Sequence, residues 1–255
     1  MEKEIKNQSI YKAIKILECF SHEQPELSIT EISKMTGLYK SNVFNVVSTL
    51  ARLGYLMQND VTSRYYLGYK FAKLAGVVES ANPLWKIAPK HVQQISNEAN
   101  ELAHFAVGTD TNTKILFVYS AYPDGMSSYD SKRMVGVTID MHCTALGKAI
   151  LASSSEQIIS NYLENGSFDK ITDYTITDKK TFEQELVKTR QLGYAVDDME
   201  REYGIRCVAV PIFLPNGEVA GAISISGPSL RMTDEKIEVF SVLLKDQSKK
   251  IELVI

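Results

Sequence analysis

The 255-residue sequence predicts an α+β chain with a helical N-terminal domain, a connecting helix and a larger mixed C-terminal domain. Three observations lead to this prediction. Two short amphipathic helical patterns are separated by a glycine within residues 28–53, and a strand–turn–strand pattern follows at 55–67. From residue 84 onward, helical patterns alternate with strand patterns, which is typical of a sheet flanked by helices.

The first helix of the N-terminal pair is predicted from its cap. Ser28 is followed three residues later by Glu31, which is a capping box, and Gly37 can end the helix in a left-handed conformation. Three apolar residues recur at helical spacing and are expected to face inward: Ile29, Ile32 and Met35. An upstream helix is expected to pack behind the pair through its own apolar stripe, formed by Ile10, Ala13, Ile14, Leu17 and Phe20.

The second helix has one apolar side and one polar, basic side. Its inward stripe is Val43, Val46, Val47, Leu50 and Leu53. The residues left to face outward or to flank that stripe can bond to base edges and phosphates: Lys40, Ser41, Asn42, Phe44, Asn45, Ser48, Thr49 and Arg52. With Thr30 and Arg64 added, they form the candidate DNA-binding surface. The alternative is an ordinary αα-hairpin with a solvated polar face.

A β-hairpin directly after the second helix favours the DNA-binding interpretation. Residues 55–58 and 64–67 are strand-like, and Asn59-Asp60 has turn chemistry. Residues 1–68 therefore predict a winged helix-turn-helix domain, with Arg64 on the wing, where basic residues commonly meet phosphate.

Charge is distributed unevenly along the chain. The net charge is −3, but residues 34–73 contain six basic residues and one acidic residue, whereas residues 83–255 contain 18 basic and 23 acidic residues. A basic patch joined to an acidic body is typical of a DNA-reading module attached to a second domain. Since the patch is small, two copies acting together are expected.

Residues 69–82 predict a connecting helix that ends at Asn82-Pro83. Its apolar face contains Phe71, Leu74, Ala75 and Val78. This face is expected either to pack against the chain's own domain or, in the interpretation we favour, to be shared between two protomers. The second domain, 83–255, is predicted to have a hairpin at Pro215-Asn216-Gly217, helices near 85–102, 143–151, 155–165 and 178–192, and a final helix from Thr233.

The assembled residues resemble the IclR-type bacterial transcriptional regulators over almost the whole chain. The matching stretches are residues 13–20, 29–32, 36–38, 40–41 and 66–68 in the first domain, and 141–152, 193–200, 204–207, 209–212 and 222–228 in the second. Each stretch alone is weakly specific, whereas their order and spacing together are highly specific.

The resemblance implies a winged helix, a linker helix and a GAF-like effector-binding domain that assemble as a homodimer or homotetramer. It further implies regulation of a metabolic operon by a small carboxylate, keto acid, aromatic acid or sugar-acid derivative. The family's effector pocket corresponds by position to Ile139, Ala145, Leu146, Asp197, Cys207, Ser224 and Ser226. Their chemistry suits this role, because Ser224 and Ser226 share one strand face and the N-terminus of a helix can bind a carboxylate.

Two positions depart from the family pattern. Asn45 stands where relatives often have arginine. Since asparagine pairs with adenine whereas arginine pairs with guanine, we expect the operator to differ from those of relatives. Met199 stands where an acidic residue is usual before Glu200, which leaves the effector class open.

An enzyme and a protein-interaction module are the competing interpretations. His142 and Cys143, with Asp197 and Cys207, could form a metal site or a nucleophile pair, but adjacent residues lack the usual zinc-ligand spacing. No phosphate-binding glycine loop or hydrolase motif is present. We therefore expect no catalytic residue, metal or cofactor. Double-stranded operator DNA and a small-molecule effector are the expected partners, and repression is favoured over activation.

The location is predicted from the cysteines and from hydrophobicity. Three cysteines are an odd and sparse set, which fits a reducing compartment. No apolar run approaches the roughly 18–20 residues that cross a bilayer, and the first residues lack the apolar core of a signal peptide. A cytoplasmic protein without membrane contact is expected.

Overall fold

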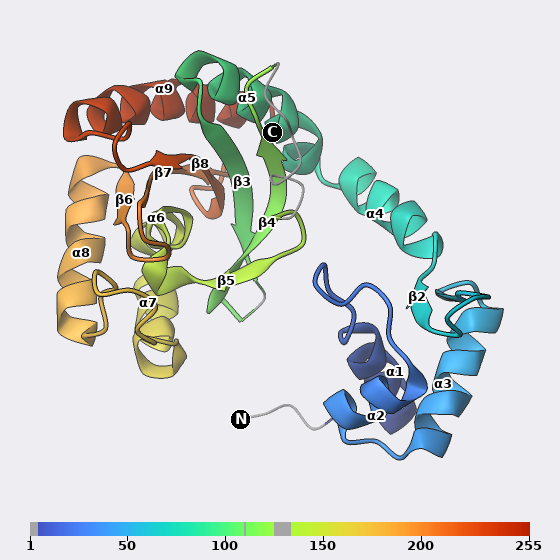
Figure 1. Cartoon of the computed structure of the whole chain (residues 1–255). Coiled ribbons are helices and arrows are strands. Elements are labelled where there is room, and N and C mark those ends of the chain that lie inside the picture. The colour runs from blue at the N-terminus through green and yellow to red at the C-terminus, as the bar shows by residue number, and fades with distance from the viewer. Residues whose placement is uncertain (1–4, 110, 125–133) are drawn as a thin grey trace. The chain divides into compact units, whose positions relative to one another are not determined.

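The computed structural model describes residues 5–109, 111–124 and 134–255. The chain divides into two compact units, Met1–Ala81 and Asn82–Ile255, which are described separately (Figure 1). The elements of the first unit are α1 (Gln8–Leu17), α2 (Ile29–Thr36), α3 (Lys40–Arg52), β1 (Leu56–Gln58), β2 (Tyr65–Leu67) and α4 (Lys70–Ala81).

The first unit is a winged helix-turn-helix, as predicted. The capping box is present, since the Ser28 hydroxyl accepts from the Glu31 N–H and the Glu31 carboxylate accepts from the Ser28 N–H. Gly37 ends α2 with φ of 72°. Strands β1 and β2 pair antiparallel, and residue Leu27 bridges to Tyr65 at the outer edge of the hairpin. The core of this unit contains Ile16, Cys19, Leu27, Ile32, Val43, Val47, Leu56 and Tyr65.

Some of the predicted inward-facing residues are exposed. In α1, Ile10 and Ile14 are 61% and 48% exposed, and Ile16 is buried in their place. Leu17 and Phe20 of the predicted stripe do pack against the core, so spacing alone found part of the buried side of α1 and missed Ile16. Met35 and Leu53 are also about half exposed. Both lie at a helix end, where the stripe turns away from the core.

The connecting helix α4 has no buried residue. Leu74, Val77 and Val78 are 45%, 59% and 47% exposed, whereas Phe71 is partly buried and contacts Tyr55 edge to face, with 5.5 Å between ring centroids. Beyond Phe71, the predicted apolar face is therefore not covered by the described part of this chain.

The second unit is built on a six-stranded antiparallel sheet with the strand order β5-β4-β3-β8-β7-β6. Its elements are α5 (Pro83–Ala99), β3 (Leu102–Gly108), β4 (Lys114–Ala121), β5 (Thr138–Asp140), the 3₁₀ helix η2 (Met141–Cys143), α6 (Ala145–Ala152), α7 (Glu156–Asn165), α8 (Lys179–Leu192), β6 (Ala195–Asp198), β7 (Ile205–Phe213), β8 (Val219–Pro228) and α9 (Asp234–Glu252).

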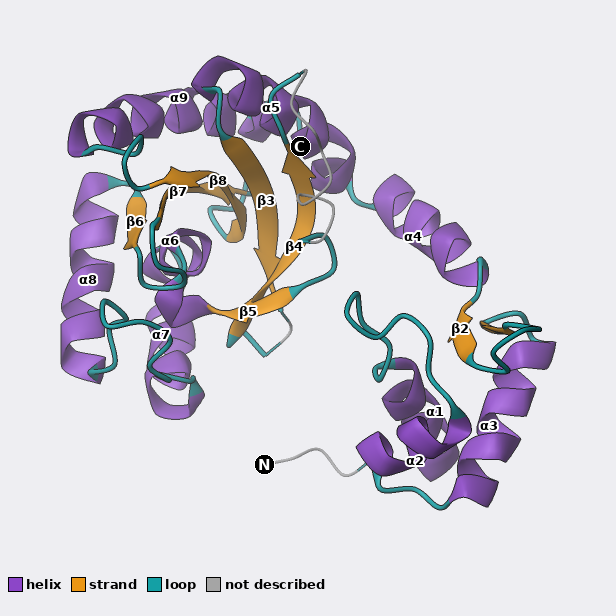
Figure 2. Cartoon of the chain, viewed as in Figure 1, coloured by secondary structure: helices purple, strands orange, loops and turns teal. Residues whose placement is uncertain are grey.

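Helices cover both faces of this sheet (Figure 2). On one face, α5 and α9 pack on large apolar strand residues such as Phe105, Ile223 and Ile225. On the other face, α6 packs on small strand residues such as Ala106 and Ala222, with α7 and α8 beyond it. Because side chains alternate along a strand, β8 presents isoleucines to one layer and small or polar residues to the other.

The predicted hairpin at Gly217 is present, and Gly217 has φ of 84°. Two short strands, β5 and β6, were not predicted. The expected single helix at 143–151 is instead η2 followed by α6, because Thr144 is extended (φ −133°, ψ 142°) and caps α6 through the Gly147 N–H. No helix among the described residues is long and apolar enough to cross a membrane.

Replacing Gly147 by alanine is expected to destabilise the second unit by about 1–3 kcal/mol or more. A Cβ at this position would lie 2.4 Å from the backbone of Met141, which cannot move aside without shifting η2. The fluorescence of Trp85, the single tryptophan, reports unfolding of this unit because Trp85 lies in α5. Gly76→Ala in α4 is the control: it has open space around it, and the Trp85 transition should not change. An unchanged urea midpoint in Gly147→Ala would contradict the close packing.

Candidate functional site

The outward side of α3 presents the residues that were predicted to contact DNA. Thr30 is exposed at the start of α2, and along α3 one residue, Ser48, is partly buried while the others are exposed: Lys40, Ser41, Asn42, Phe44, Asn45, Thr49 and Arg52. Opposite them, Val43 and Val47 are fully buried. The helix is therefore anchored on one side and free on the other, as recognition of a groove requires.

The N-terminus of α3 has unoccupied backbone donors. Its N-cap, Tyr39, makes no side-chain cap bond, and its first turn contains no acidic residue. Lys40 and Ser41 occupy this turn. Free N–H groups, the helix dipole and a lysine together favour a phosphate.

Arg64 lies at the wing as predicted, but its charge is paired. Its guanidinium donates to both carboxylate oxygens of Glu31, at 2.6 and 2.7 Å. Hydrogen bonds from Ser28, together with Arg64, lower the pKa of Glu31 to about 2. Arg64 thus joins the wing to the N-terminus of α2, and a phosphate would have to compete with Glu31 for it.

In the second unit, the structure brings all seven predicted effector-binding residues together. They line one cavity of about 330 Å³ between the sheet and the N-terminus of α6: Ile139, Ala145, Leu146, Asp197, Cys207, Ser224 and Ser226. Residues that sequence reasoning did not select complete the lining, including His104, Phe117, Met134, Arg201 and Arg231. A volume of this size suits a small organic molecule.

Asp197 is the central polar group of the cavity. It is 3% exposed, and its Oδ1 accepts the Glu200 N–H at 2.8 Å and the Arg201 N–H at 3.4 Å. Burial, reinforced by repulsion from Glu200, raises the pKa of Asp197 to about 7 in spite of the attraction of Lys148. This carboxyl can therefore be present as a neutral donor near neutral pH.

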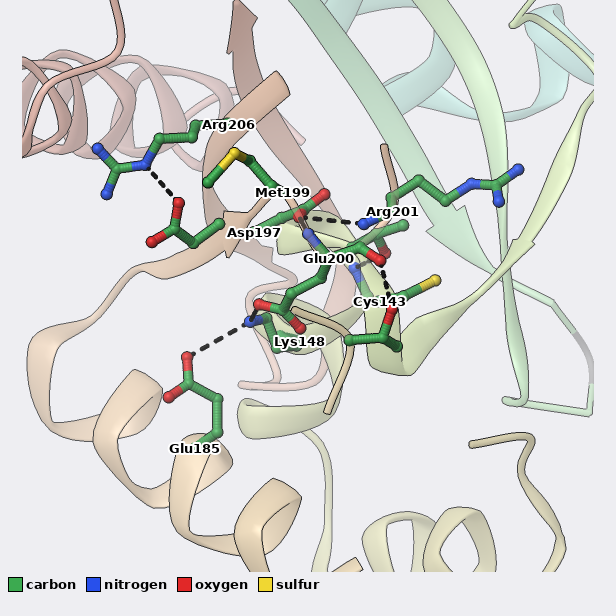
Figure 3. A network of polar contacts seen from close by, with 12 residues as sticks. Cys143, Lys148, Glu185, Asp197, Met199, Glu200, Arg201 and Arg206 are labelled. Atoms are coloured by element: carbon green, nitrogen blue, oxygen red, sulfur yellow. Dashed lines mark hydrogen bonds and ion pairs between the residues drawn. The ribbon is translucent and has the colours of Figure 1, made fainter. Parts of the chain in front are cut away.

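A buried ion-pair network supports Asp197 from behind (Figure 3). Lys148 of α6 is fully buried, and its Nζ donates to Glu200 at 2.5 Å and to Glu185 of α8 at 3.4 Å. Burial lowers the pKa of Lys148, but attraction from the two glutamates outweighs it and the pKa is raised overall. The network fixes the turn after β6 to α6. Nothing in the sequence predicts this network, because Lys148 is a single lysine in an otherwise apolar helix.

Three side chains on β7 and β8 contribute further polar atoms. The Ser226 hydroxyl donates to Cys207 Sγ at 3.1 Å, and burial raises the pKa of the Cys207 thiol. The Ser224 hydroxyl is buried, and no hydrogen bond to it comes from the described part of the chain. A buried unpaired hydroxyl that lines a cavity is positioned to bond a ligand.

Positive groups lie around the cavity. Arg201 is exposed and lines it, and Arg231 lines it while paired with Glu101 at 2.5 and 2.7 Å. The backbone of Ala145 and Leu146 forms the first turn of α6, where free N–H groups favour an anion. Met199 is not among the lining residues. It has φ of 61°, and its carbonyl accepts from Thr172, so its part is in the turn.

His142 and Cys143 do not form a reactive pair. The His142 Nε2 bonds to the Asp169 carbonyl at 3.0 Å, and burial raises the pKa of Cys143 to about 12. The thiol is protonated and buried, which is unsuitable for nucleophilic or ligand chemistry. Among the described residues, no group of three potential ligands could hold a metal ion.

A winged helix with a free recognition side, in a chain that also contains a ligand-sized cavity, defines a DNA-binding regulator of the ligand-responsive class. Comparison with known families agrees with this class. Residues 76–253 match the bacterial transcriptional regulator IclR C-terminal domain, and residues 9–60 match the IclR helix-turn-helix domain. The chain belongs to the IclR family of transcriptional regulators, and it is not an enzyme.

Similar proteins have the same two-domain extent. The chain is 30% identical to the HTH-type transcriptional regulator XynR of Escherichia coli over 91% of both chains, and 27% identical to the transcriptional repressor IclR of the same organism over 96% of this chain and 89% of that one. The crystal structure of Thermotoga maritima IclR aligns with a TM-score of 0.74 at 30% identity, covering 96% of this chain and 97% of that one.

Proposed function

We propose that this regulator represses an operon by binding its operator through α3, and that a small carboxylate in the cavity around Asp197 controls the binding. The observation that supports the effector site most strongly is the convergence of Asp197, the unpaired Ser224 hydroxyl and the first turn of α6 on one cavity. These three groups come from separate segments of the chain, and the packing of the core does not by itself require them to line the same cavity.

The charges around the cavity favour an anionic ligand. Glu101 is neutralised by Arg231, and Lys148 neutralises Glu200 behind the cavity wall. Arg201 and the N-terminus of α6 then remain to meet a carboxylate, while Asp197 can take up a proton. Glu202 also lines the cavity, but it is exposed, so solvent screens its charge. The apolar residues Phe117, Met134 and Ile139 would surround the carbon skeleton.

The proposed mechanism is a population shift. Effector in the cavity would favour one arrangement of paired winged helices, and operator DNA would favour another. A ligand moves such a balance only by its differential affinity for the two forms. Pairing is proposed through a homodimer or homotetramer, in which a second copy would cover the exposed Leu74, Val77 and Val78 of α4.

Two substitutions on α3 should have different effects on DNA binding. Lys40→Ala should weaken binding to all sequences and reduce the salt slope by about one, because it removes a phosphate contact. Asn45→Ala should mainly blur the sequence preference, costing about 1–3 kcal/mol at the matched base. Fluorescence anisotropy on labelled operator and scrambled DNA, across a salt series, separates the two. Unchanged specificity in Asn45→Ala would mean that another residue reads the base.

The cavity is tested with Ser226→Trp. The indole should fill the space beside Cys207 and abolish the response of DNA binding to carboxylates, leaving operator binding measurable in the same anisotropy assay. Wild-type protein with a panel of small acids is the comparison. A full response to the acid in the tryptophan variant would place the effector elsewhere. Salt-independent binding of wild-type protein would instead favour a protein-interaction module, since phosphate contacts lose affinity as salt rises.

A further inference from the structure

The effector cavity has a second polar end, where His104, which was not predicted, lies beside the predicted Ser224. His104 of β3 lines the cavity, and it is the register partner of Ser224 on β8. Directly opposed residues on antiparallel strands project from the same face of a sheet, with Cβ atoms about 4.5–5.5 Å apart. The flanking residues Ala103 and Phe105 belong to the opposite core, so His104 faces the cavity with Ser224.

The His104 ring is fixed, and one nitrogen remains available. Its Nδ1 lies 2.7 Å from the Ser120 hydroxyl, and Phe117 packs edge-on against the ring with 5.2 Å between centroids. No hydrogen bond from the described residues reaches Nε2. Burial lowers the pKa of His104 to about 4, so the imidazole is neutral at physiological pH. A neutral ring has no net charge with which to hold a carboxylate, but at Nε2 it can donate or accept one hydrogen bond.

Ser224, like His104, has a hydrogen-bonding group that is available to a ligand. Its hydroxyl is buried, 1% exposed as a residue, and unpaired within the described chain. Leaving a buried hydroxyl without a partner is unfavourable, and a ligand oxygen would satisfy it. His104 and Ser224 together therefore match one uncharged oxygen. A carbonyl oxygen would accept a hydrogen bond from each, and a hydroxyl would donate to one and accept from the other.

We propose that His104 and Ser224 form a subsite for a hydroxyl or carbonyl oxygen of the effector, and that His104 thereby determines specificity for hydroxy or keto acids over the corresponding plain acids. This inference rests on the proposed effector function, in which the carboxylate is bound by Arg201 and the first turn of α6. The two ends of the ligand are recognised by different chemistry. The charged end gives affinity for acids in general, and the neutral end selects among them.

The test compares matched acids by isothermal titration calorimetry on the full-length protein. The probes are propionate with lactate and pyruvate, butyrate with 2-hydroxybutyrate and 2-oxobutyrate, and benzoate with 4-hydroxybenzoate. In at least one set, wild-type protein should bind the oxygenated acid roughly 10-fold or more tightly than the plain acid, since the plain acid leaves the buried Ser224 hydroxyl unpaired and gives the His104 Nε2 no partner.

Two variants assign that preference. His104→Phe preserves the ring shape and should reduce the ratio to within about threefold while the plain acid still binds. Ser224→Ala deletes a hydroxyl that has no hydrogen-bond partner among the described residues, so it should fold normally and reduce the ratio as well. The matched control is Arg201→Gln, which should weaken both acids of a set equally and leave the ratio unchanged.

The outcomes separate this inference from the proposed function. Equal binding of plain and oxygenated acids by wild-type protein would overturn the subsite alone, as would a ratio that survives in both Ser224→Ala and a folded His104→Phe. If no acid of any set bound, the carboxylate-effector proposal would fall, and the subsite with it. A preference that is lost in the two subsite variants and kept in Arg201→Gln supports the assignment.

Discussion

Lys148→Met is expected to lower the free energy of unfolding of the second unit by about 3–5 kcal/mol, because it leaves a buried glutamate without its counter-ion. Both partners of this ion pair are buried: the Lys148 side chain is 0% exposed and the Glu200 side chain is 6% exposed. One Glu200 oxygen, Oε2, already has no hydrogen-bond partner among the described residues. Methionine fills a similar volume, so lost packing contributes little to the effect.

The double variant Lys148→Met/Glu200→Gln is the control. Removing both charges should recover most of the lost stability, to within about 1–2 kcal/mol of wild type, since a neutral pair avoids the buried uncompensated charge. Urea unfolding followed by Trp85 fluorescence gives the free energy of unfolding of the second unit in wild type, the single variant and the double variant. If the free energy of unfolding of the single variant fell by less than about 1 kcal/mol, Glu200 would be taking up a proton or finding another partner. The ion pair would then not be what holds the turn after β6 to α6.

The N-terminal unit could be predicted from sequence because its signals are local. The capping box at Ser28, the left-handed Gly37 and the hairpin at Asn59 each depend on residues a few positions apart. The ion pair between Glu31 and Arg64 spans 33 residues, and no pattern within either segment indicates it. The same limit explains Ile16, since two apolar sides of α1 differ only in what packs against them.

In the second unit, the family motifs located the cavity, while its supporting groups came from the structure. Strands β5 and β6 contain three and four residues. This is too short for the alternation of apolar and polar residues in a strand to be told apart from the pattern of a loop. Lys148 lies inside an otherwise apolar helix, and its partner Glu200 is 52 residues away. His104 resembles any strand histidine until its register with Ser224 is known. Long-range pairing, which single-sequence patterns do not contain, determines all of these.

Asp197→Asn is expected to change the pH dependence of stability. The pKa of Asp197 is about 7 in the fold, against an ordinary value of 3.8 for an aspartate in the unfolded chain. Below pH 4 the group is protonated in both states and contributes no penalty. As pH rises from 4 to 7, the unfolded chain releases the proton first, so stability is lost through this window and the loss is complete above pH 7.

The rise of the Asp197 pKa from 3.8 to about 7 corresponds to a penalty of roughly 4 kcal/mol above pH 7. The stability of the variant relative to wild type should therefore increase as pH rises from 4 to 8. The difference between the two free energies of unfolding in urea isolates the contribution of Asp197 from those of other titrating groups. Asparagine can still accept the Glu200 and Arg201 N–H groups through its Oδ1, so the turn after β6 should be preserved. A difference that stays flat over this range would mean that Asp197 is ionised throughout.

The same proton should be coupled to the effector. The titratable and charged groups around Asp197 are Lys148 on α6, Glu200 and Arg201 in the following turn, and Cys143 and Cys207; Glu202 and the neutral His104 line the same cavity. Lys148 is committed to the glutamates and both thiols are protonated, so a bound carboxylate adds repulsion that Asp197 relieves by keeping its proton. Affinity for a small acid should then fall up to tenfold per pH unit above pH 7 in wild type. In Asp197→Asn, whose amide cannot ionise, calorimetry at pH 6 to 9 should give a nearly constant affinity.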